Sequence, residues 1–392
     1  MTVLSAASRS YRPLSRSEKW FRNLFQKAFE GLKEGQIHLQ DGDGSVMLGT
    51  ANKGKPVHLQ IFDGAAYREI LLEGSVGAGR SYANGLWKTS DLPRLLSLAA
   101  GHEAALKKLR SGWSLPATLG MRLISIAQRN TRRGSRKNIA AHYDLGNQFF
   151  QTFLDKHMMY SSALYAPHHS SLEEASEYKL QRLCEKLDLG SKDHLLEIGT
   201  GWGGLAIYAA QHYGCRVTTT TISPSQHRYA QERVAQSHLG DRVSVIQKDY
   251  RDLSGSFTKI VSVEMIEAVG REFIDGYFSV MNRLLTPGGR IVLQAIVIDD
   301  DEFERAARSV DFIKRYIFPG SCIPSRRRIA EAVQGSTNVQ PDGVEDLTQS
   351  YVRTLAAWRS RFLGAKEQIL QMGFSKEFIR LWDFYFSYCQ GG

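Results

Sequence analysis

The feature that most constrains the fold is an alternation of short apolar strands with helix-like stretches, from about residue 139 onward. Strands that alternate with helices in this way are typical of βαβ units, in which successive strands lie parallel in one sheet. The sequence therefore predicts an α/β catalytic domain over residues 139–392. Its strands are expected at residues 194–198, 216–222, 243–247, 259–263 and 290–298.

Glycines follow directly after the first of these strands, at Gly199, Gly201 and Gly203. They allow a tight turn and a close approach of the backbone to a ligand at the N-terminus of the next helix. The spacing is not the GxGxxG of dinucleotide binding, and the absence of a following GKS or GKT argues against a P-loop. Glu197, just before the turn, could hold the cationic amino group of S-adenosylmethionine or accept hydrogen bonds from neighbouring loop amides.

The second predicted strand ends in Thr221, where an acidic residue is expected if the strand recognises a ribose. The polar side chains of Thr221, Ser223 and Gln226 could replace that acid. The same residues also fit ordinary capping of the helix predicted over residues 226–237. The residues alone leave both interpretations open.

The pattern of apolar, basic and turn-forming residues divides the chain into three segments. Residues 1–100 combine strand-like stretches, such as 57–61, with turn signals, and they predict a small α/β accessory domain. Residues 101–138 predict a basic helical linker, and the catalytic domain follows it. No internal repeat and no low-complexity tract is visible.

The linker carries most of the net charge of +10, which arises from 50 Lys and Arg against 40 Asp and Glu. Between residues 101 and 137 the one acidic residue is Glu103. Such a cluster attracts a polyanion, either nucleic acid or an anionic membrane face, unless it is only a solvated connector. Its basic residues are Lys107, Lys108, Arg110, Arg122, Arg129, Arg132, Arg133, Arg136 and Lys137.

The cysteines and the hydropathy exclude other classes of protein. Cys184, Cys215, Cys322 and Cys389 are far apart, which argues against a disulfide scaffold and against a zinc site and fits a reducing cytosol. No metal site is expected. No apolar run approaches the roughly 18 residues that a membrane-spanning helix needs, and the N-terminus lacks a signal-peptide core.

Several motifs follow one another along the chain: His142–Asn147, Met159–Ser162, Leu196–Gly204, Thr221–Gln226, Glu264–Gly270, Tyr316–Gly320 and Tyr351–Trp358. In this order they resemble the cyclopropane fatty acid synthases, and the resemblance extends from about Gly79 to the last residue. It implies a Rossmann-like class I S-adenosylmethionine-dependent methyltransferase. The implied reaction is methylene transfer to cis double bonds of unsaturated phospholipid acyl chains, with a small N-terminal domain that engages the membrane.

The resemblance also assigns residues to roles. Glu267 and Tyr351 would hold a bicarbonate ion that acts as the base, together with Gln294 and the backbone amides of Ser162 and Ile296. Glu267 also fits a solvated loop carboxylate. The residues expected to line the cofactor site are Tyr143, Tyr160, Ser161, Glu197, Gly199, Thr200, Gly201, Gly203, Thr221, Ile222, Gln226, Tyr250 and Arg251.

Four departures from the family pattern stand out. Ser162 takes a position often held by Cys, and Gln294 and Ala268 take positions often held by His. Gln donates a hydrogen bond but cannot become a cation. The chain also stops where relatives usually continue into two closing strands, so these strands are expected to be absent.

The sequence is compatible with more than one reaction product. If the proton is lost from the new methyl group, a cyclopropane forms; loss from another carbon, or reduction of the cation, gives a methyl-unsaturated or methyl-branched chain. Apolar side chains could line an acyl channel, or they could be ordinary core. These are Met158, Met159, Phe312, Ile317 and Phe318.

Other classes of protein fit the sequence less well. A small-molecule amine methyltransferase would favour a carboxylate–His pair, and Ala268 supplies no His. The sequence contains no base-methylation motif and no aromatic-basic pattern of an RNA-binding sheet, so no nucleic-acid partner is expected. A non-catalytic lipid-binding paralogue is a further alternative. We expect a cytoplasmic protein that associates peripherally with the inner face of the membrane. Its expected partners are unsaturated phospholipids and an anionic membrane surface. A homodimer is compatible with the resemblance.

Overall fold

The computed structural model describes residues 11–50, 54–102, 130–131, 134–135, 145–168 and 170–392. The chain forms two compact units, one of residues 1–120 and 359–392 and one of residues 121–358. The C-terminal 34 residues thus belong with the N-terminal unit, whereas the sequence placed them in the catalytic domain. Most of the basic linker and Tyr143 lie outside the described residues.

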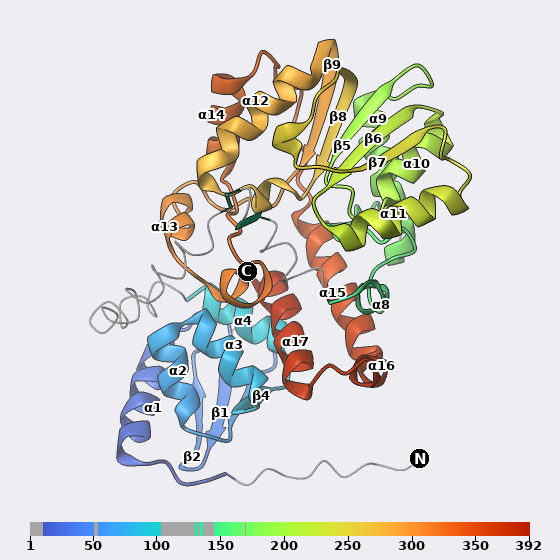
Figure 1. The fold of residues 1–392 in the computed structure, drawn as a ribbon. Helices are drawn as coiled ribbons and strands as arrows, with labels where there is room; N and C mark the ends of the chain where they lie inside the picture. Colours follow the sequence, from blue (N-terminus) through green and yellow to red (C-terminus); the bar gives the residue numbers. More distant parts are fainter. Residues whose placement is uncertain (1–10, 51–53, 103–129, 132–133, 136–144, 169) are drawn as a thin grey trace. The chain divides into compact units, whose positions relative to one another are not determined.

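The first unit contains a four-stranded sheet of order β2-β1-β3-β4 (Figure 1). β1 pairs antiparallel with β2 and parallel with β3, and the strand expected at residues 57–61 is confirmed. The elements are α1 (Arg16–Phe29), β1 (Ile37–Asp41), β2 (Gly44–Leu48), β3 (Val57–Ile61), α2 (Ala65–Glu73), α3 (Ser75–Ala83), β4 (Trp87–Thr89), α4 (Leu92–Ala100), α16 (Lys366–Gln371) and α17 (Lys376–Gly391).

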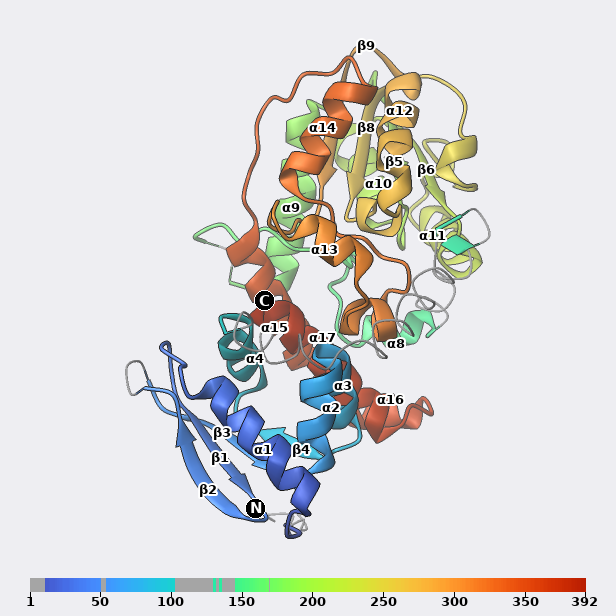
Figure 2. The same cartoon turned by 90° about the vertical axis from the view of Figure 1, so that its left-hand side faces the viewer.

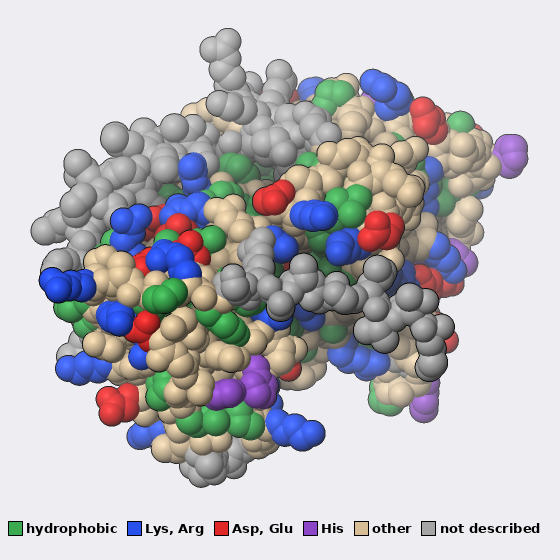
Figure 3. Space-filling model, turned by 90° about the horizontal axis from the view of Figure 1, so that it is seen from below, with side chains coloured by type: hydrophobic (Ala, Val, Ile, Leu, Met, Phe, Trp, Pro, Cys, Tyr) green, Lys and Arg blue, Asp and Glu red, His purple; other side chains and the backbone are tan. Residues whose placement is uncertain are grey.

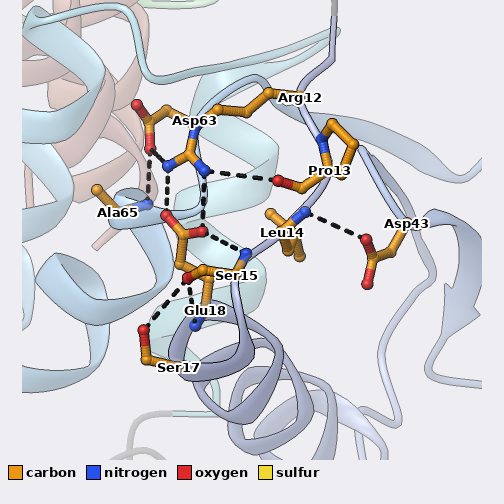
Figure 4. Close-up of polar contacts among 9 residues, drawn as sticks. All are labelled: Arg12, Pro13, Leu14, Ser15, Ser17, Glu18, Asp43, Asp63 and Ala65. Carbon is orange, nitrogen blue, oxygen red and sulfur yellow. Dashed lines mark hydrogen bonds and ion pairs between the residues drawn. The ribbon is translucent and has the colours of Figure 1, made fainter.

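The start of α1 is fixed by a capping box and an ion-pair network (Figure 4). The Ser15 hydroxyl accepts from the Glu18 backbone N–H, and the Glu18 carboxylate accepts from the Ser15 backbone N–H at 2.8 Å. Arg12 pairs with Glu18 and with Asp63, the latter at 2.9 Å. The backbone N–H of Leu14 donates to Asp43 at 3.2 Å, as the figure also shows. Two orphan amides of the helix terminus are therefore satisfied.

Helix α17 joins the first unit through buried polar contacts. It packs against α3 and α4. Asp383 of α17 accepts a hydrogen bond from the Tyr82 hydroxyl at 2.7 Å and pairs with Arg359 at 2.6 Å. Both partners of Asp383 are only partly exposed, so the carboxylate is compensated inside the unit.

The second unit contains a five-stranded, all-parallel sheet of order β7-β6-β5-β8-β9. Helices α9, α10 and α11 cover one face of the sheet, and α12 and α14 cover the other (Figures 1 and 2). Buried apolar side chains of these helices form the core on each face. This confirms the α/β class. The elements are α8 (Asn147–Gln151), α9 (Leu172–Leu187), β5 (His194–Ile198), α10 (Gly204–Tyr213), β6 (Arg216–Thr221), α11 (Pro224–Gln236), β7 (Val243–Gln247), β8 (Phe257–Val263), α12 (Ile274–Leu284), β9 (Leu285–Gln294), α13 (Phe303–Arg308), α14 (Arg326–Ser336) and α15 (Thr348–Gly364).

The order of the strands reverses at β5, whose neighbours are β6 on one side and β8 on the other. Ligands of open α/β sheets bind at the carboxyl ends of the strands at such a switch point. Among the described residues the sheet ends at β9, and an isolated bridge links Ile298 and Ser325.

None of the described helices combines the length and the apolarity required to cross a bilayer. On the face seen in Figure 3, Lys and Arg side chains are spread among acidic and apolar ones and do not gather in one patch.

Candidate functional site

The glycine turn lies at the carboxyl end of β5 and leads into α10. Gly199, Gly201 and Gly203 all have positive φ angles, of 104°, 51° and 84°. A Cβ at Gly204 would lie 2.3 Å from the backbone oxygen of His157, so that position excludes any larger residue. The turn thus requires glycine both for its conformation and for its packing.

Glu197 is buried beside this turn and bonds to the neighbouring strand. Its carboxyl accepts a hydrogen bond from the Thr219 hydroxyl at 2.5 Å, and the Thr200 hydroxyl lies 2.7 Å from the same oxygen of Thr219. Burial raises the pKa of Glu197 to about 8. The carboxyl bonds a side chain of β6 in this structure, and its contact with a cofactor amino group stays a prediction.

The polar residues after β6 cap a helix and contact each other. Ser223 is the N-cap of α11, where its hydroxyl accepts from the Gln226 backbone N–H at 3.3 Å. The Thr221 hydroxyl donates to the Gln226 side-chain oxygen at 3.0 Å. The capping interpretation therefore holds for Ser223. Thr221 and Gln226 are buried at the end of the strand next to the glycine turn, and Ile222 lies between them in the chain.

Tyr250 and Arg251 follow β7 in a short helical turn. The Arg251 guanidinium makes two hydrogen bonds to the Asp249 carboxylate, at 2.8 and 2.7 Å. The buried Tyr250 ring packs edge-on against Tyr277 with 5.0 Å between the ring centroids. The end of β7 is therefore rigid, and its charge is paired within the loop.

An aromatic cluster surrounds Tyr160, which lies in the segment before α9. The Tyr160 ring centroid is 5.3 Å from that of Trp358, 5.4 Å from that of Phe150 and 6.1 Å from that of Phe318. Aromatic faces of this kind stabilise a neighbouring cation. The other proposed channel residues Met158, Phe312 and Ile317 are buried, which fits core packing equally well.

Beside this cluster the structure places a buried lysine that the sequence reasoning missed. Lys179 of α9 is 1% exposed, and its ammonium group donates to the Ser161 hydroxyl at 2.7 Å. Burial lowers the pKa of Lys179 to about 8, while the negative charges of Glu264 and Asp155 act in the opposite direction. A lysine within the apolar stripe of a helix is the sequence signal that could have found it.

A second residue that the sequence reasoning did not select is Glu264, directly after β8. One oxygen of its carboxylate accepts from the Ser162 backbone N–H at 2.8 Å and from the Gln294 side-chain amide at 2.9 Å. The Tyr351 hydroxyl lies 3.4 Å from the other oxygen. Three residues predicted to hold bicarbonate are therefore brought together, but around the carboxylate of Glu264.

Glu267 is buried nearby in a turn of residues 266–268. Its carboxyl accepts from the Ile296 backbone N–H at 2.5 Å, and its other oxygen is buried and has no hydrogen-bond partner among the residues that the structure describes. Burial, and then the negative charge of Glu264, raise the pKa of Glu267 to about 8. Glu267 is therefore a buried group and not a solvated loop carboxylate.

These contacts test whether the residues fit a bicarbonate ion. The donors that the resemblance assigns to the ion are Ser162, Gln294, Tyr351 and Ile296. The first three contact the Glu264 carboxylate, and the Ile296 backbone N–H donates a hydrogen bond to Glu267. A free anion at these donors would have to displace a carboxylate and would lie against two carboxyl groups. The residues present do not fit bicarbonate.

The glycine turn and the loop of the two carboxyl groups contact each other. A Cβ at Gly199 would lie 2.9 Å from the Met265 side chain, and Met265 stands between Glu264 and Glu267 in the sequence. The glycine turn therefore lies next to the loop that carries the two carboxyl groups.

Comparison with known proteins identifies close relatives. The family described as mycolic acid cyclopropane synthetase matches residues 130–392. The chain is 36% identical over 335 residues to tuberculostearic acid methyltransferase UfaA1 of Mycobacterium tuberculosis, an alignment covering 84% of this chain and 78% of that protein. It is also 36% identical over 343 residues to cyclopropane-fatty-acyl-phospholipid synthase of Escherichia coli, covering 87% and 85%.

A solved structure extends the likeness to the fold. Mycolic acid cyclopropane synthase CmaA1, in a complex with SAH and CTAB, is 29% identical and superposes with a TM-score of 0.59. The superposition covers 65% of this chain and 92% of that one. The likeness supports both the Rossmann-like core and S-adenosylmethionine as the cofactor.

Proposed function

The chain belongs to the mycolic acid cyclopropane synthetase family and is an S-adenosylmethionine-dependent methyltransferase, and from this premise we propose that it alkylates cis double bonds of phospholipid acyl chains. The favoured product is a cyclopropane fatty acid. The observation that carries the proposal is the contact between the glycine turn and the loop of Glu264 and Glu267, because it brings a cofactor turn and buried carboxyl groups together.

The cofactor, when bound, supplies an electrophilic methyl group. The glycine turn at the end of β5 would let the backbone approach it, and Thr221 and Gln226 offer polar contacts at the end of β6. An alkene is a poor nucleophile, so the site must align the two reactants and exclude water that would trap the product cation.

The protein side chains suit a cationic intermediate on the acyl chain. The aromatic faces of Tyr160, Trp358 and Phe150 stabilise a desolvated cation by ~1–2 kcal/mol. A proton acceptor must then remove a proton from the cationic intermediate. The carboxyl groups of Glu264 and Glu267, in the loop next to the glycine turn, are the candidate acceptors. Loss of that proton from the transferred carbon closes the ring.

A second product is a methyl-branched or methyl-unsaturated chain. Two observations favour it: Gln294 cannot become a cation, and a relative with 36% identity is named a methyltransferase rather than a cyclopropane synthase. The catalytic core is compatible with a cyclopropane and with a methyl-unsaturated chain, because these two products differ in the carbon that loses the proton. A saturated methyl branch requires a hydride donor in addition.

The site of action follows from the substrate. Phospholipid acyl chains are presented by a membrane, so we propose peripheral association with the cytoplasmic face, where anionic lipids attract the basic residues between 101 and 137. Bicarbonate, which the resemblance implied, has no part in this proposal because its donors are used by the carboxyl groups.

Labelled methyl donor tests the proposal and separates the products. The purified protein is incubated with vesicles of cis-unsaturated phospholipids and with S-adenosylmethionine that carries a trideuterated methyl group. Mass spectrometry should find two of the three deuterium atoms in the lipid, because one deuterium is lost from the transferred carbon on ring closure. NMR should show the protons on the two ring carbons of the former double bond. Retention of all three would indicate a methyl branch. Vesicles of saturated lipids are the control, and absence of label from unsaturated lipids would contradict the proposal.

A further inference from the structure

Glu264 occupies the centre of the hydrogen-bond donors that were expected to bind an external anion. We propose that the Glu264 carboxylate is itself the anion of this site, that it takes the place assigned to bicarbonate, and that it accepts the proton released during alkylation. The last step rests on the proposed function, whereas the first two do not.

The direction of the donors supports this assignment. The Gln294 side-chain amide donates both to Glu264 at 2.9 Å and to the backbone oxygen of Ser162 at 3.1 Å. The Ser162 backbone N–H donates back to the same Glu264 oxygen at 2.8 Å. This closed arrangement fixes the amide with its NH₂ group toward the carboxylate, so Gln294 supplies what an anion requires without carrying charge.

The backbone at Glu264 provides an independent observation. Its φ angle is +47°, in the left-handed region that a residue with a side chain rarely adopts. Its backbone N–H bonds to the Gln294 carbonyl oxygen at 2.8 Å, which holds the conformation. Glycine would adopt this conformation without strain, so a residue with a side chain is unfavourable for the backbone at this position. Strain of this kind at the end of a strand points to a function of the side chain.

The surrounding charges favour one anion at this position and oppose a second. The buried ammonium of Lys179 attracts the Glu264 carboxylate, and it donates a hydrogen bond to the Ser161 hydroxyl, next to Ser162 in the chain. Glu267 contributes an unpaired buried oxygen. A bicarbonate ion would add a further negative charge next to both carboxyl groups, without an additional cation in the described site to compensate it.

The proposed proton transfer balances. The C–S bond of the cofactor breaks with its electron pair on sulfur, while the π pair of the alkene forms the new C–C bond and leaves a cation on the other carbon. A C–H bond of the transferred group then breaks, its electron pair closes the ring, and the proton passes to the Glu264 carboxylate. The resulting carboxylic acid must lose that proton to water before the next turnover.

The binding test uses carbon-13-labelled bicarbonate and requires no lipid. NMR line broadening of the labelled ion is measured with the wild type, with Glu264→Gly and with the control Glu331→Gln, an exposed carboxylate of α14. The wild type and the control should show no saturable broadening. Glu264→Gly, which frees the donors and relaxes the backbone, should show it. Saturable binding by the wild type within threefold of the affinity of Glu264→Gly would overturn the proposal.

The turnover test uses the isosteric variant Glu264→Gln in carbonate-free buffer. Wild-type turnover should not change when bicarbonate is added, whereas Glu264→Gln should lose at least a hundredfold in kcat with an unchanged melting temperature. Bicarbonate should partly restore Glu264→Gly. Wild-type turnover that requires bicarbonate, or full activity of Glu264→Gln, would refute the role of Glu264. Absence of any labelled lipid with the wild type would instead contradict the proposed function, and the binding result would still decide the assignment of the anion.

Discussion

The raised pKa of Glu267 makes the stability of the protein depend on pH in a defined direction. Its pKa is about 8 in the folded state against an ordinary value of 4.5. Unfolded Glu267 is ionised throughout that window while the folded side chain keeps its proton, so folding takes up a proton. The contribution of Glu267 to the free energy of unfolding therefore decreases by about 1.4 kcal/mol for each pH unit across the window, about 5 kcal/mol in total, and levels off above it.

Glu267→Gln isolates this contribution, because Gln retains the oxygen that accepts from Ile296 and never ionises. Chemical denaturation of the wild type and the variant between about pH 5 and pH 8 gives the free energies of unfolding. The variant should gain on the wild type by about 1.4 kcal/mol for each pH unit, and Glu331→Gln should follow the wild type. A difference that does not change with pH would show that Glu267 ionises as freely in the folded chain as in the unfolded one.

Two further predictions concern packing. Gly204→Ala should lower the free energy of unfolding by at least ~2 kcal/mol and weaken cofactor binding, because its Cβ would meet the His157 carbonyl oxygen at 2.3 Å. The control Gly276→Ala, on the exposed side of α12 with no atom within 4 Å of its Cβ, should leave cofactor binding unchanged in calorimetry and should not lower the free energy of unfolding in denaturation. Tyr82→Phe removes the hydrogen bond to Asp383 and should destabilise the first unit by ~1 kcal/mol in thermal denaturation; an unchanged melting temperature would show that this bond does not support α17.

The sequence predicted the catalytic sheet well because local pattern determines it. The strand predicted at residues 243–247 and the first strand before the glycine turn have the predicted bounds, and the strand predicted at 290–298 begins earlier in the structure, at Leu285. That difference arises where Pro287-Gly288-Gly289 reads as a turn, yet β9 pairs with β8 through a register shift at its start. Turn chemistry was overridden there by pairing between strands.

The placement of the C-terminal helices could not be predicted from local pattern. α17 reads as an ordinary amphipathic helix after the catalytic domain, and the contact that places it joins Tyr82 to Asp383, 301 positions apart. Such a contact leaves no periodic signal in either segment, because each side chain alone also fits an exposed position. The resemblance along the chain likewise carries no information on which unit a helix joins.

The candidate site shows the same division between composition and contact. The donors Ser162, Gln294 and Tyr351 were predicted from matching positions, but their common acceptor was not, because a carboxylate on the same loop can replace an ion without changing any donor. The pair Glu264 and Glu267 also has unequal surroundings: Glu264 has three donors and an attractive lysine, and Glu267 has one donor and an unpaired oxygen. Burial raises the pKa of both carboxyl groups, but at Glu264 the hydrogen-bond donors and the positive charge of Lys179 oppose that rise, so Glu264 is the partner better able to carry a negative charge. It follows that Glu267 contributes by staying neutral, which leaves the negative charge, and with it the capacity to accept a proton, on Glu264.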